Sequence, residues 1–191
     1  MQDKSISRRD VLKLGGYATL GSLLVPAHAS EAMAGMYSKG NVKSGTREVM
    51  FRNAHTGESF SGVYRVGNKY LPDAFDKINY VLRDFRTNDV FPIDPRLIDI
   101  IYTVHQMSDT SRPYEVISGY RSPKTNNMLR KAGSGVAKKS FHMSGQAMDL
   151  RLPDFSSRRV YDLTKSLKAG GVGYYNSSNF VHIDTGTVRA W

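Results

Sequence analysis

The chain has 191 residues, 40% of them hydrophobic and 23% charged, and its formal net charge is +10. This length favours one domain with its own hydrophobic core, because one core typically serves about 100–200 residues. The sequence contains no cysteine, which excludes disulfide bonds and any thiolate-ligated metal site.

The first 29 residues have the pattern of an export signal. Paired Arg8 and Arg9 precede an apolar run over 15–25, and Ala27-His28-Ala29 offers the small residues that signal peptidase requires. We therefore predict a twin-arginine signal peptide over 1–29 and a periplasmic protein. A short membrane anchor is the alternative, although the run is shorter than the ~20 residues of a spanning helix. Cleavage would remove four Lys/Arg and two Asp/Glu, and would leave 162 residues, a net charge of +8 and no membrane span.

The folded domain is expected over residues 47–191. Residues 30–46 are rich in Gly, Ser, Ala and Met, which predicts a flexible lead-in. Residues 47–53 and 59–66 look like two strands, and His55-Thr56-Gly57-Glu58 would join them as a hairpin.

Helices and further strands follow in the rest of the chain. Four helices are predicted, either from an apolar repeat of about 3.6 residues or from a capping residue followed by proline. They begin at Pro72, Asp94, Ser122 and Ser156, and the first should bury a face that extends to Phe85. Strands are expected over 115–118, 147–152 and 180–184, with a turn at Gly170–Gly173. This order predicts an α+β fold with a small antiparallel sheet flanked by helices.

Two histidines and one aspartate are placed on or beside the later strands. His142 precedes the strand that carries Asp149, and His182 lies in the last strand. Two imidazoles and one carboxylate are a set that binds zinc and leaves a fourth position to water. The alternative is a buried His142–Asp149 hydrogen bond and an unrelated strand histidine, and the spacing alone does not decide between them. His55 and His105 are expected to have no chemical role.

Several blocks of the sequence resemble the D-Ala-D-Ala metallopeptidase family, whose fold is shared with the hedgehog signalling domain. They are ISGYRSPKTNN (Ile117–Asn127), KKSFHMSGQAMDLRL (Lys138–Leu152) and GGVGYYNSSNFVHIDTG (Gly170–Gly186). A likeness to the MepK-type periplasmic murein endopeptidases is wider, since it includes the export signal, Asn53–Ser59, Arg83–Leu97 and the final Trp191. The resemblance implies a hedgehog-like fold and a zinc peptidase that hydrolyses peptide cross-links of peptidoglycan during cell-wall growth and remodelling.

The resemblance also implies roles for individual residues. One zinc ion per chain would be held by His142, Asp149 and His182. Arg121 matches an arginine that stabilises charge on the reacting carbonyl oxygen. Ser140 matches a position that holds the substrate backbone, and Tyr120, beside Arg121 in the Ser-Gly-Tyr-Arg block, is a second substrate-binding candidate.

The general base of the family does not transfer to this sequence. Relatives place an acid three residues before the last zinc ligand, or a histidine two residues before it. Asn179 and Phe180 occupy those positions here, and neither accepts a proton. Asp184 is the nearest carboxylate and should share a strand face with His182. It would either move the proton, or hydrogen-bond the strand end or orient a ligand.

Residues 121–139 carry six cations and no acid, and lead directly to His142. They form either a solvated surface or a positive rim that attracts the carboxylates of peptidoglycan stem peptides. Nucleic acid is not an expected partner, because the protein is exported and lacks a basic stripe interleaved with aromatic residues. Two alternatives to the endopeptidase stay open: a D,D-carboxypeptidase of the same fold, and a zinc-containing domain that binds wall peptides or regulates a hydrolase without catalysis. The sequence makes no prediction of oligomeric state.

Overall fold

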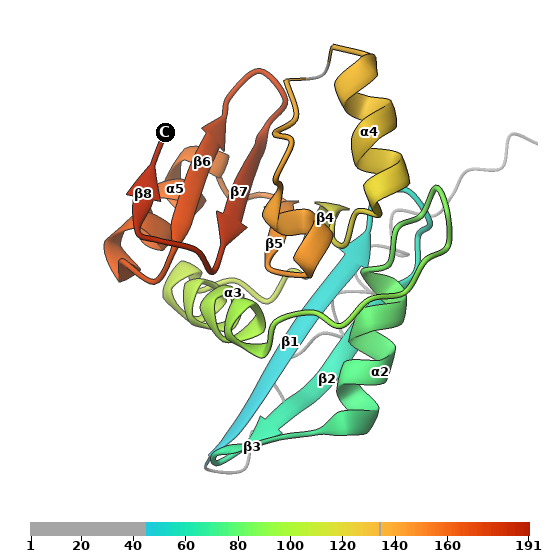
Figure 1. Cartoon of the computed structure of the whole chain (residues 1–191). Helices are drawn as coiled ribbons and strands as arrows, with labels where there is room; N and C mark the ends of the chain where they lie inside the picture. Colours follow the sequence, from blue (N-terminus) through green and yellow to red (C-terminus); the bar gives the residue numbers. More distant parts are fainter. Residues whose placement is uncertain (1–44, 134) are drawn as a thin grey trace, which may run out of the picture.

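The computed structural model describes residues 45–133 and 135–191 (Figure 1). The predicted signal peptide over 1–29 and nearly all of the predicted lead-in lie outside the described residues. The strands are β1 (Thr46–Asn53), β2 (Ser59–Val66), β3 (Lys69–Tyr70), β4 (Tyr114–Ser118), β5 (Ala147–Arg151), β6 (Gly171–Tyr175), β7 (Phe180–Asp184) and β8 (Arg189–Ala190). The helices are α2 (Pro72–Val81), α3 (Pro95–Ser108), α4 (Pro123–Lys131), α5 (Ser157–Leu167) and the 3₁₀ helix η2 (Phe141–Ser144).

The described strands form one eight-stranded sheet in the order β3-β2-β1-β4-β5-β7-β6-β8. The α+β class is confirmed, but the sheet is larger than expected and mixed, because β1 pairs with β4 and β6 with β8 in parallel. The predicted turn at Gly170–Gly173 was wrong, since Gly171 begins β6. Glycine suits this strand because a Cβ at Gly173 would lie 2.6 Å from the indole of Trp191.

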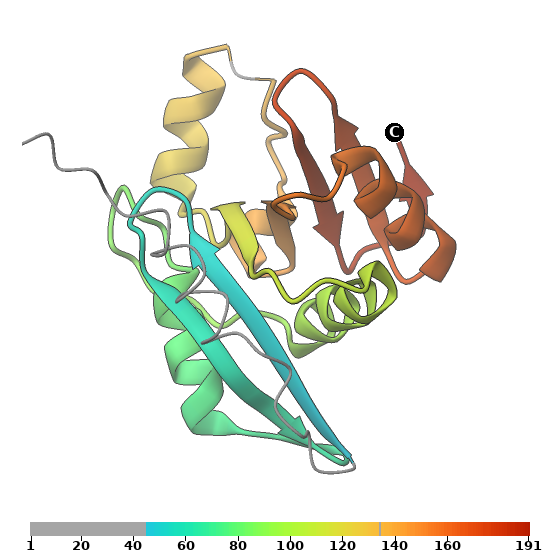
Figure 2. The same cartoon turned by 180° about the vertical axis from the view of Figure 1, so that it is seen from behind.

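The two faces of the sheet differ around β5 and β7. Met148 and Leu150 of β5, with Val181 and Ile183 of β7, belong to the hydrophobic core. Helices α3 and α5 pack together, and α5 packs on β6 and β7, as the view from behind shows (Figure 2). Because side chains alternate along a strand, Asp149 and His182 project from the opposite face.

Helix α2 ends earlier than predicted, and Phe85 is not part of it. The reason is a turn over 83–89, in which the Asp84 carbonyl accepts a hydrogen bond from the Asn88 amide at 2.7 Å. The Asp84 carboxylate then accepts the amide of Ser122 at 2.8 Å, which joins this turn to the start of α4.

The predicted starts of α3 and α4 are confirmed. Asp94 caps α3 by accepting the amide of Arg96, and Ser122 caps α4 by accepting the amide of Thr125, with proline next in both helices. None of the helices within 45–133 and 135–191 has the length and apolar character needed to cross a bilayer.

Candidate metal centre

The local backbone around η2 fixes the position of His142. Ser140 caps η2 by accepting the amide of His142, and the carbonyl of His142 accepts the amide of Arg121 at 3.1 Å. The chain then turns at Gly145, whose φ is +66° and where a Cβ would lie 2.1 Å from the carbonyl oxygen of Pro92. Only glycine fits this close to the Pro92 carbonyl. Gly145 therefore allows the tight turn that connects η2 to β5.

Asp149 and His182 are brought together by strand pairing. They are direct partners in the antiparallel ladder of β5 and β7, so their side chains leave the same face of the sheet. Asp149 is 8% exposed and His142 is 2% exposed, so the group is largely shielded from solvent.

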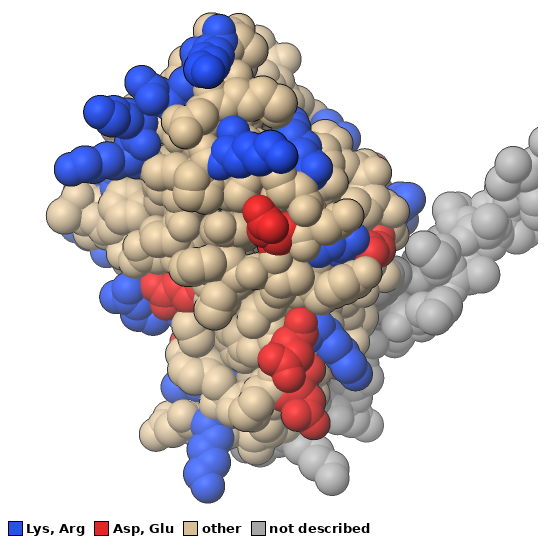
Figure 3. Space-filling view, turned by 45° about the vertical axis from the view of Figure 1, so that its right-hand side comes forward, with Lys and Arg blue, Asp and Glu red and all other residues tan. Residues whose placement is uncertain are grey.

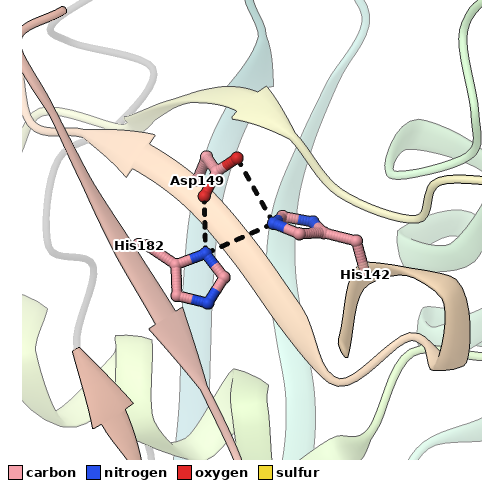
Figure 4. Close-up of side chains that lie close together, drawn as sticks. All are labelled: His142, Asp149 and His182. Atoms are coloured by element: carbon pink, nitrogen blue, oxygen red, sulfur yellow. Dashed lines mark hydrogen bonds and ion pairs between the residues drawn. The ribbon is translucent and has the colours of Figure 1, made fainter. Parts of the chain in front are cut away.

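The three side chains converge on one point (Figure 4). His182 Nδ1 lies 2.8 Å from Asp149 Oδ1 and 3.3 Å from His142 Nε2, and His142 Nε2 lies 3.3 Å from Asp149 Oδ2. Among the residues that the structure describes, these three form the one group of His, Asp and Glu side chains placed to hold a metal ion. The predicted ligands therefore do meet in space.

The outer nitrogen of each imidazole has its own hydrogen-bond partner. His142 Nδ1 lies 2.8 Å from the carbonyl oxygen of Gly119. A carbonyl only accepts, so Nδ1 carries the proton and Nε2 is left with a lone pair directed at the centre. His182 Nε2 lies 3.0 Å from Asp184 Oδ2, which leaves its Nδ1 directed at the centre. Such outer partners commonly set the tautomer of metal-binding histidines.

Asp184 lies behind His182 and not at the centre. Its carboxylate is fully buried, and Arg189 donates to both oxygens, at 3.0 Å to Oδ1 and 2.6 Å to Oδ2. The amide of Gly186 also donates to Oδ1, at 2.9 Å. Asp184 and His182 share a strand face as predicted, but the carboxylate contacts the ring nitrogen opposite the centre. This geometry favours ligand orientation over proton transfer as the role of Asp184.

Burial and neighbouring charges oppose one another in this group. Burial would raise the pKa of Asp149, but the imidazoles of His142 and His182 hold it well below its ordinary value. Burial would lower the pKa of His182, yet hydrogen bonds with Asp149 and Asp184 raise it to about 9. Burial would also raise the pKa of Asp184, and its bonds with His182 and Arg189 lower it instead. The carboxylates that stabilise an imidazolium here would equally stabilise a metal dication.

The centre opens into a cavity of about 420 Å³. Arg121 and Ser140 line it, together with the three predicted ligands. Arg121 Nη2 lies 3.6 Å from Asp149 Oδ2 and donates to Ser118 Oγ at 3.3 Å, while its buried Nε has no hydrogen-bond partner. Burial lowers the pKa of Arg121 and Asp149 partly offsets this effect. The guanidinium therefore lines the cavity as a cation held beside Asp149.

Other residues singled out in the sequence lie elsewhere. Tyr120 stacks on Phe91 at 4.8 Å and is absent from the described lining of the cavity, so its substrate role stays a prediction. Asn179 accepts a hydrogen bond from Ser157 of α5 at 2.7 Å. His55 stacks on the ring of Phe85, and His105 Nε2 bonds the carbonyl of Arg112 at 2.8 Å.

Sequence reasoning missed three supporting groups: the carbonyl of Gly119, Arg189 and Trp191. A Cβ at Gly119 would lie 2.5 Å from the carbonyl oxygen of Leu82, so glycine brings this backbone close to α2 and fixes the acceptor for His142. Residue types do not reveal which carbonyl faces an imidazole. Arg189 carries no local signal either, because its link to Asp184 depends on the pairing of β8 with β6.

Comparison with known proteins shows which family this chain belongs to. The sequence profile described as peptidoglycan L,D-endopeptidase MepK matches residues 41–191. The chain belongs to this family. It is 41% identical over 185 residues to peptidoglycan L,D-endopeptidase MepK of Escherichia coli K12, covering 97% of both chains. It is 39% identical over 186 residues to the probable peptidoglycan L,D-endopeptidase MepK of Haemophilus influenzae, covering 97% of this chain and 95% of that one.

The family assignment confirms the resemblance to the MepK-type murein endopeptidases. Among solved structures, the L-Ala D-Glu endopeptidase ChiX of Serratia marcescens matches with a TM-score of 0.33 and 20% identity. That match covers 40% of this chain and 62% of the other, and is too limited to inform the fold.

Proposed function

We propose that the protein is a zinc-dependent peptidoglycan endopeptidase that is exported to the periplasm through a twin-arginine signal. The convergence of His142, Asp149 and His182 in a family of peptidoglycan endopeptidases is the observation that carries this proposal. The donor set fits zinc, because two neutral imidazole nitrogens and one carboxylate oxygen face one point and leave a coordination position open.

The same three side chains would hold the ion. Zinc, when bound, supplies a Lewis acid that polarises the scissile carbonyl and makes a water molecule acidic enough to attack near neutral pH. Asp184 and Arg189 keep the ring of His182 in one orientation, and Gly119 does the same for His142. Both histidines are therefore preorganised.

Arg121 would stabilise the negative charge that develops on the carbonyl oxygen. Its guanidinium lines the cavity, with Nη2 3.6 Å from Oδ2 of Asp149. A fixed cation in a shielded site stabilises developing charge more strongly than the same cation in water. Ser140 lines the same cavity and would contact the substrate backbone.

The substrate would be a cross-link between two stem peptides. The relatives are named for an L,D bond. Of the two cross-links that the sequence leaves open, D-Ala–diaminopimelate joins two D centres, whereas the diaminopimelate–diaminopimelate bond joins an L centre to a D centre. We therefore favour the bond between two diaminopimelates.

Digestion of purified sacculi, with and without a chelator, tests the proposal when the products are read by mass spectrometry. Conversion of cross-linked dimers to monomers that stops with chelator is the expected result. Release of D-Ala alone would instead identify a carboxypeptidase. Binding of muropeptides by the zinc-loaded protein with dimers left intact would identify a non-catalytic domain.

A further inference from the structure

Four aromatic residues line the cavity beside the predicted zinc ligands, and three of them, Tyr175, Phe180 and Trp191, lie on or next to strands β6, β7 and β8. Tyr175 and Phe180 are direct partners in the β6–β7 ladder, and their rings stack at 4.5 Å with an interplanar angle of 14°. The Trp191 indole N–H donates to the Tyr175 hydroxyl at 3.2 Å, and its ring centroid lies 5.5 Å from that of His182. We call Tyr175, Phe180 and Trp191 the aromatic wall.

The aromatic wall is held in place by the protein yet is open to the cavity. The amide and carbonyl of Trp191 bond the backbone of Val172 and Tyr174, and Gly173 leaves room for the indole. Tyr175 is nevertheless 39% exposed and Trp191 is 48% exposed. Large aromatic rings gain stability from burial, so a fixed but exposed apolar surface beside a reactive centre is typical of a ligand site.

Positive charge is also available in the cavity. The segment 135–140 lies beside β7 in both views of the ribbon (Figures 1 and 2), and Lys139 of this segment lines the cavity. The arginines of the lining, Arg121 and Arg189, already face Asp149 and Asp184. Lys139 is exposed and has no ion pair with any residue that the structure describes.

Cationic side chains are also frequent on the wider surface of the molecule. In Figure 3, Lys and Arg gather over the upper part of the molecule, at the height of α4, while acidic side chains lie lower. An anionic substrate would therefore be attracted to this side of the molecule.

We propose that the aromatic wall and Lys139 form a subsite for an aliphatic side chain that ends in a carboxylate. This subsite rests on the proposed function, and it would hold a residue close to the scissile bond. The methylene groups would pack on the aromatic wall, and the carboxylate would pair with the Lys139 ammonium group. In a stem peptide diaminopimelate has this chemistry, and the free α-carboxylate of glutamate is the other anionic group that could pair with Lys139.

Three soluble cross-linked dimers test the subsite: one with the diaminopimelate and glutamate carboxylates free, one amidated at its diaminopimelate residues and one amidated at its glutamate residues. We expect wild-type enzyme to cleave the free-acid dimer with a kcat/KM about tenfold above that of one of the two amidated dimers. A charge-assisted hydrogen bond typically contributes a binding free energy that corresponds to about this ratio. The amide that is cleaved poorly identifies which carboxylate is bound. Lys139→Gln should remove this preference by slowing cleavage of the free acid alone. Lys138→Gln is the matched control, because it removes the neighbouring charge outside the described lining and should keep the preference.

Trp191→Leu tests the apolar half of the subsite. It should lower kcat/KM at least about tenfold on all three dimers and leave the ratio between them unchanged, since the loss of an apolar contact with a substrate typically costs about 10–200-fold. Equal cleavage of the dimers by wild type, or a wild-type preference in Lys139→Gln, would overturn the subsite while leaving the endopeptidase intact. Cleavage of none of the dimers by wild type would overturn the proposed function and the subsite together.

Discussion

His182 and Asp184 are linked by a 3.0 Å contact between Nε2 and Oδ2, on the side of the imidazole that faces away from Asp149. A carboxylate two residues after a metal ligand can act as a general base or can orient that ligand. The contact between Asp184 and His182 distinguishes these two roles. A base must reach the cavity, whereas Asp184 is fully buried and has both oxygens bonded by Arg189. From its contact with His182 we propose that Asp184 is a positioning residue.

Asp184→Asn should weaken zinc binding about 10–100-fold, as the loss of an outer-shell partner typically does. Turnover should recover when zinc is supplied in excess. Chelator competition gives the affinity, and kcat at saturating zinc gives the second readout. Unchanged affinity combined with a low kcat would return Asp184 to the role of a proton carrier.

Replacing any predicted ligand should abolish metal binding and activity together. His142→Ala, Asp149→Ala and His182→Ala each remove one of three donors that lie within 4.8 Å of one another. Metal analysis of the purified variants and sacculus digestion are the measurements. His55→Ala is the control and should keep both properties, since its ring is exposed and stacks on Phe85. Turnover by any of the three ligand variants would contradict the assignment.

Arg121→Gln should lower kcat/KM by about 10²–10³-fold and leave the zinc content unchanged, because removing one donor to a developing oxyanion typically costs that much. Arg121→Lys restores a charge but not the planar fork of donors, so it should recover only part of the rate. A variant without the guanidinium that keeps wild-type kinetics would exclude Arg121 from the reaction.

Gly145→Ala should destabilise the fold more than Gly133→Ala. Both glycines have positive φ, +66° and +73°, so both alanines pay a similar backbone strain. A Cβ at Gly145 would lie 2.1 Å from the carbonyl oxygen of Pro92, whereas nothing lies within 4 Å of one at Gly133. We expect a loss of roughly 1–2 kcal/mol for Gly133→Ala. Gly145→Ala should lose clearly more of the free energy of unfolding, as measured by thermal denaturation. Equal losses would mean that the backbone near Pro92 shifts to accommodate the added methyl group.

The Asp84 carboxylate should make stability depend on pH. Burial would raise its pKa, but hydrogen bonds from Thr125, Ser122 and Arg86 lower it below the ordinary value. A group with a depressed folded pKa stabilises the fold above its unfolded pKa, about 4, and this contribution is lost as the pH falls below that value. Asp84→Asn should therefore lower the melting temperature at pH 7 and have a smaller effect at pH 3. A constant difference between the two proteins would show that the charge is not responsible.

Local sequence signals were sufficient for part of the fold and of the site. The caps at Asp94 and Ser122 act within one helical turn, so they located α3 and α4 correctly. The strands that carry Asp149 and His182 were also located correctly, over 147–152 and 180–184. These features depend on residues close together in the chain.

Features that depend on distant contacts could not be predicted. Strand β8 has two residues and exists because it pairs with β6, so Arg189 could not be placed beside Asp184, nor Trp191 beside His182, in advance. Gly171 and Gly173 suggested a turn. They are instead strand residues at which a Cβ would collide with the side chains of Arg189 and Trp191. The resemblance to a family supplied the ligands, and it could not supply the carbonyl of Gly119 that orients one of them.

The direct pairing of Asp149 with His182 makes the metal centre a test of correct strand alignment. Since successive side chains alternate between faces, a slip of one position between β5 and β7 would send an imidazole into the core and an aliphatic chain into the cavity. Misaligned molecules would thus be unable to bind the ion, and the metal content of a preparation would measure the fraction of molecules that is correctly folded.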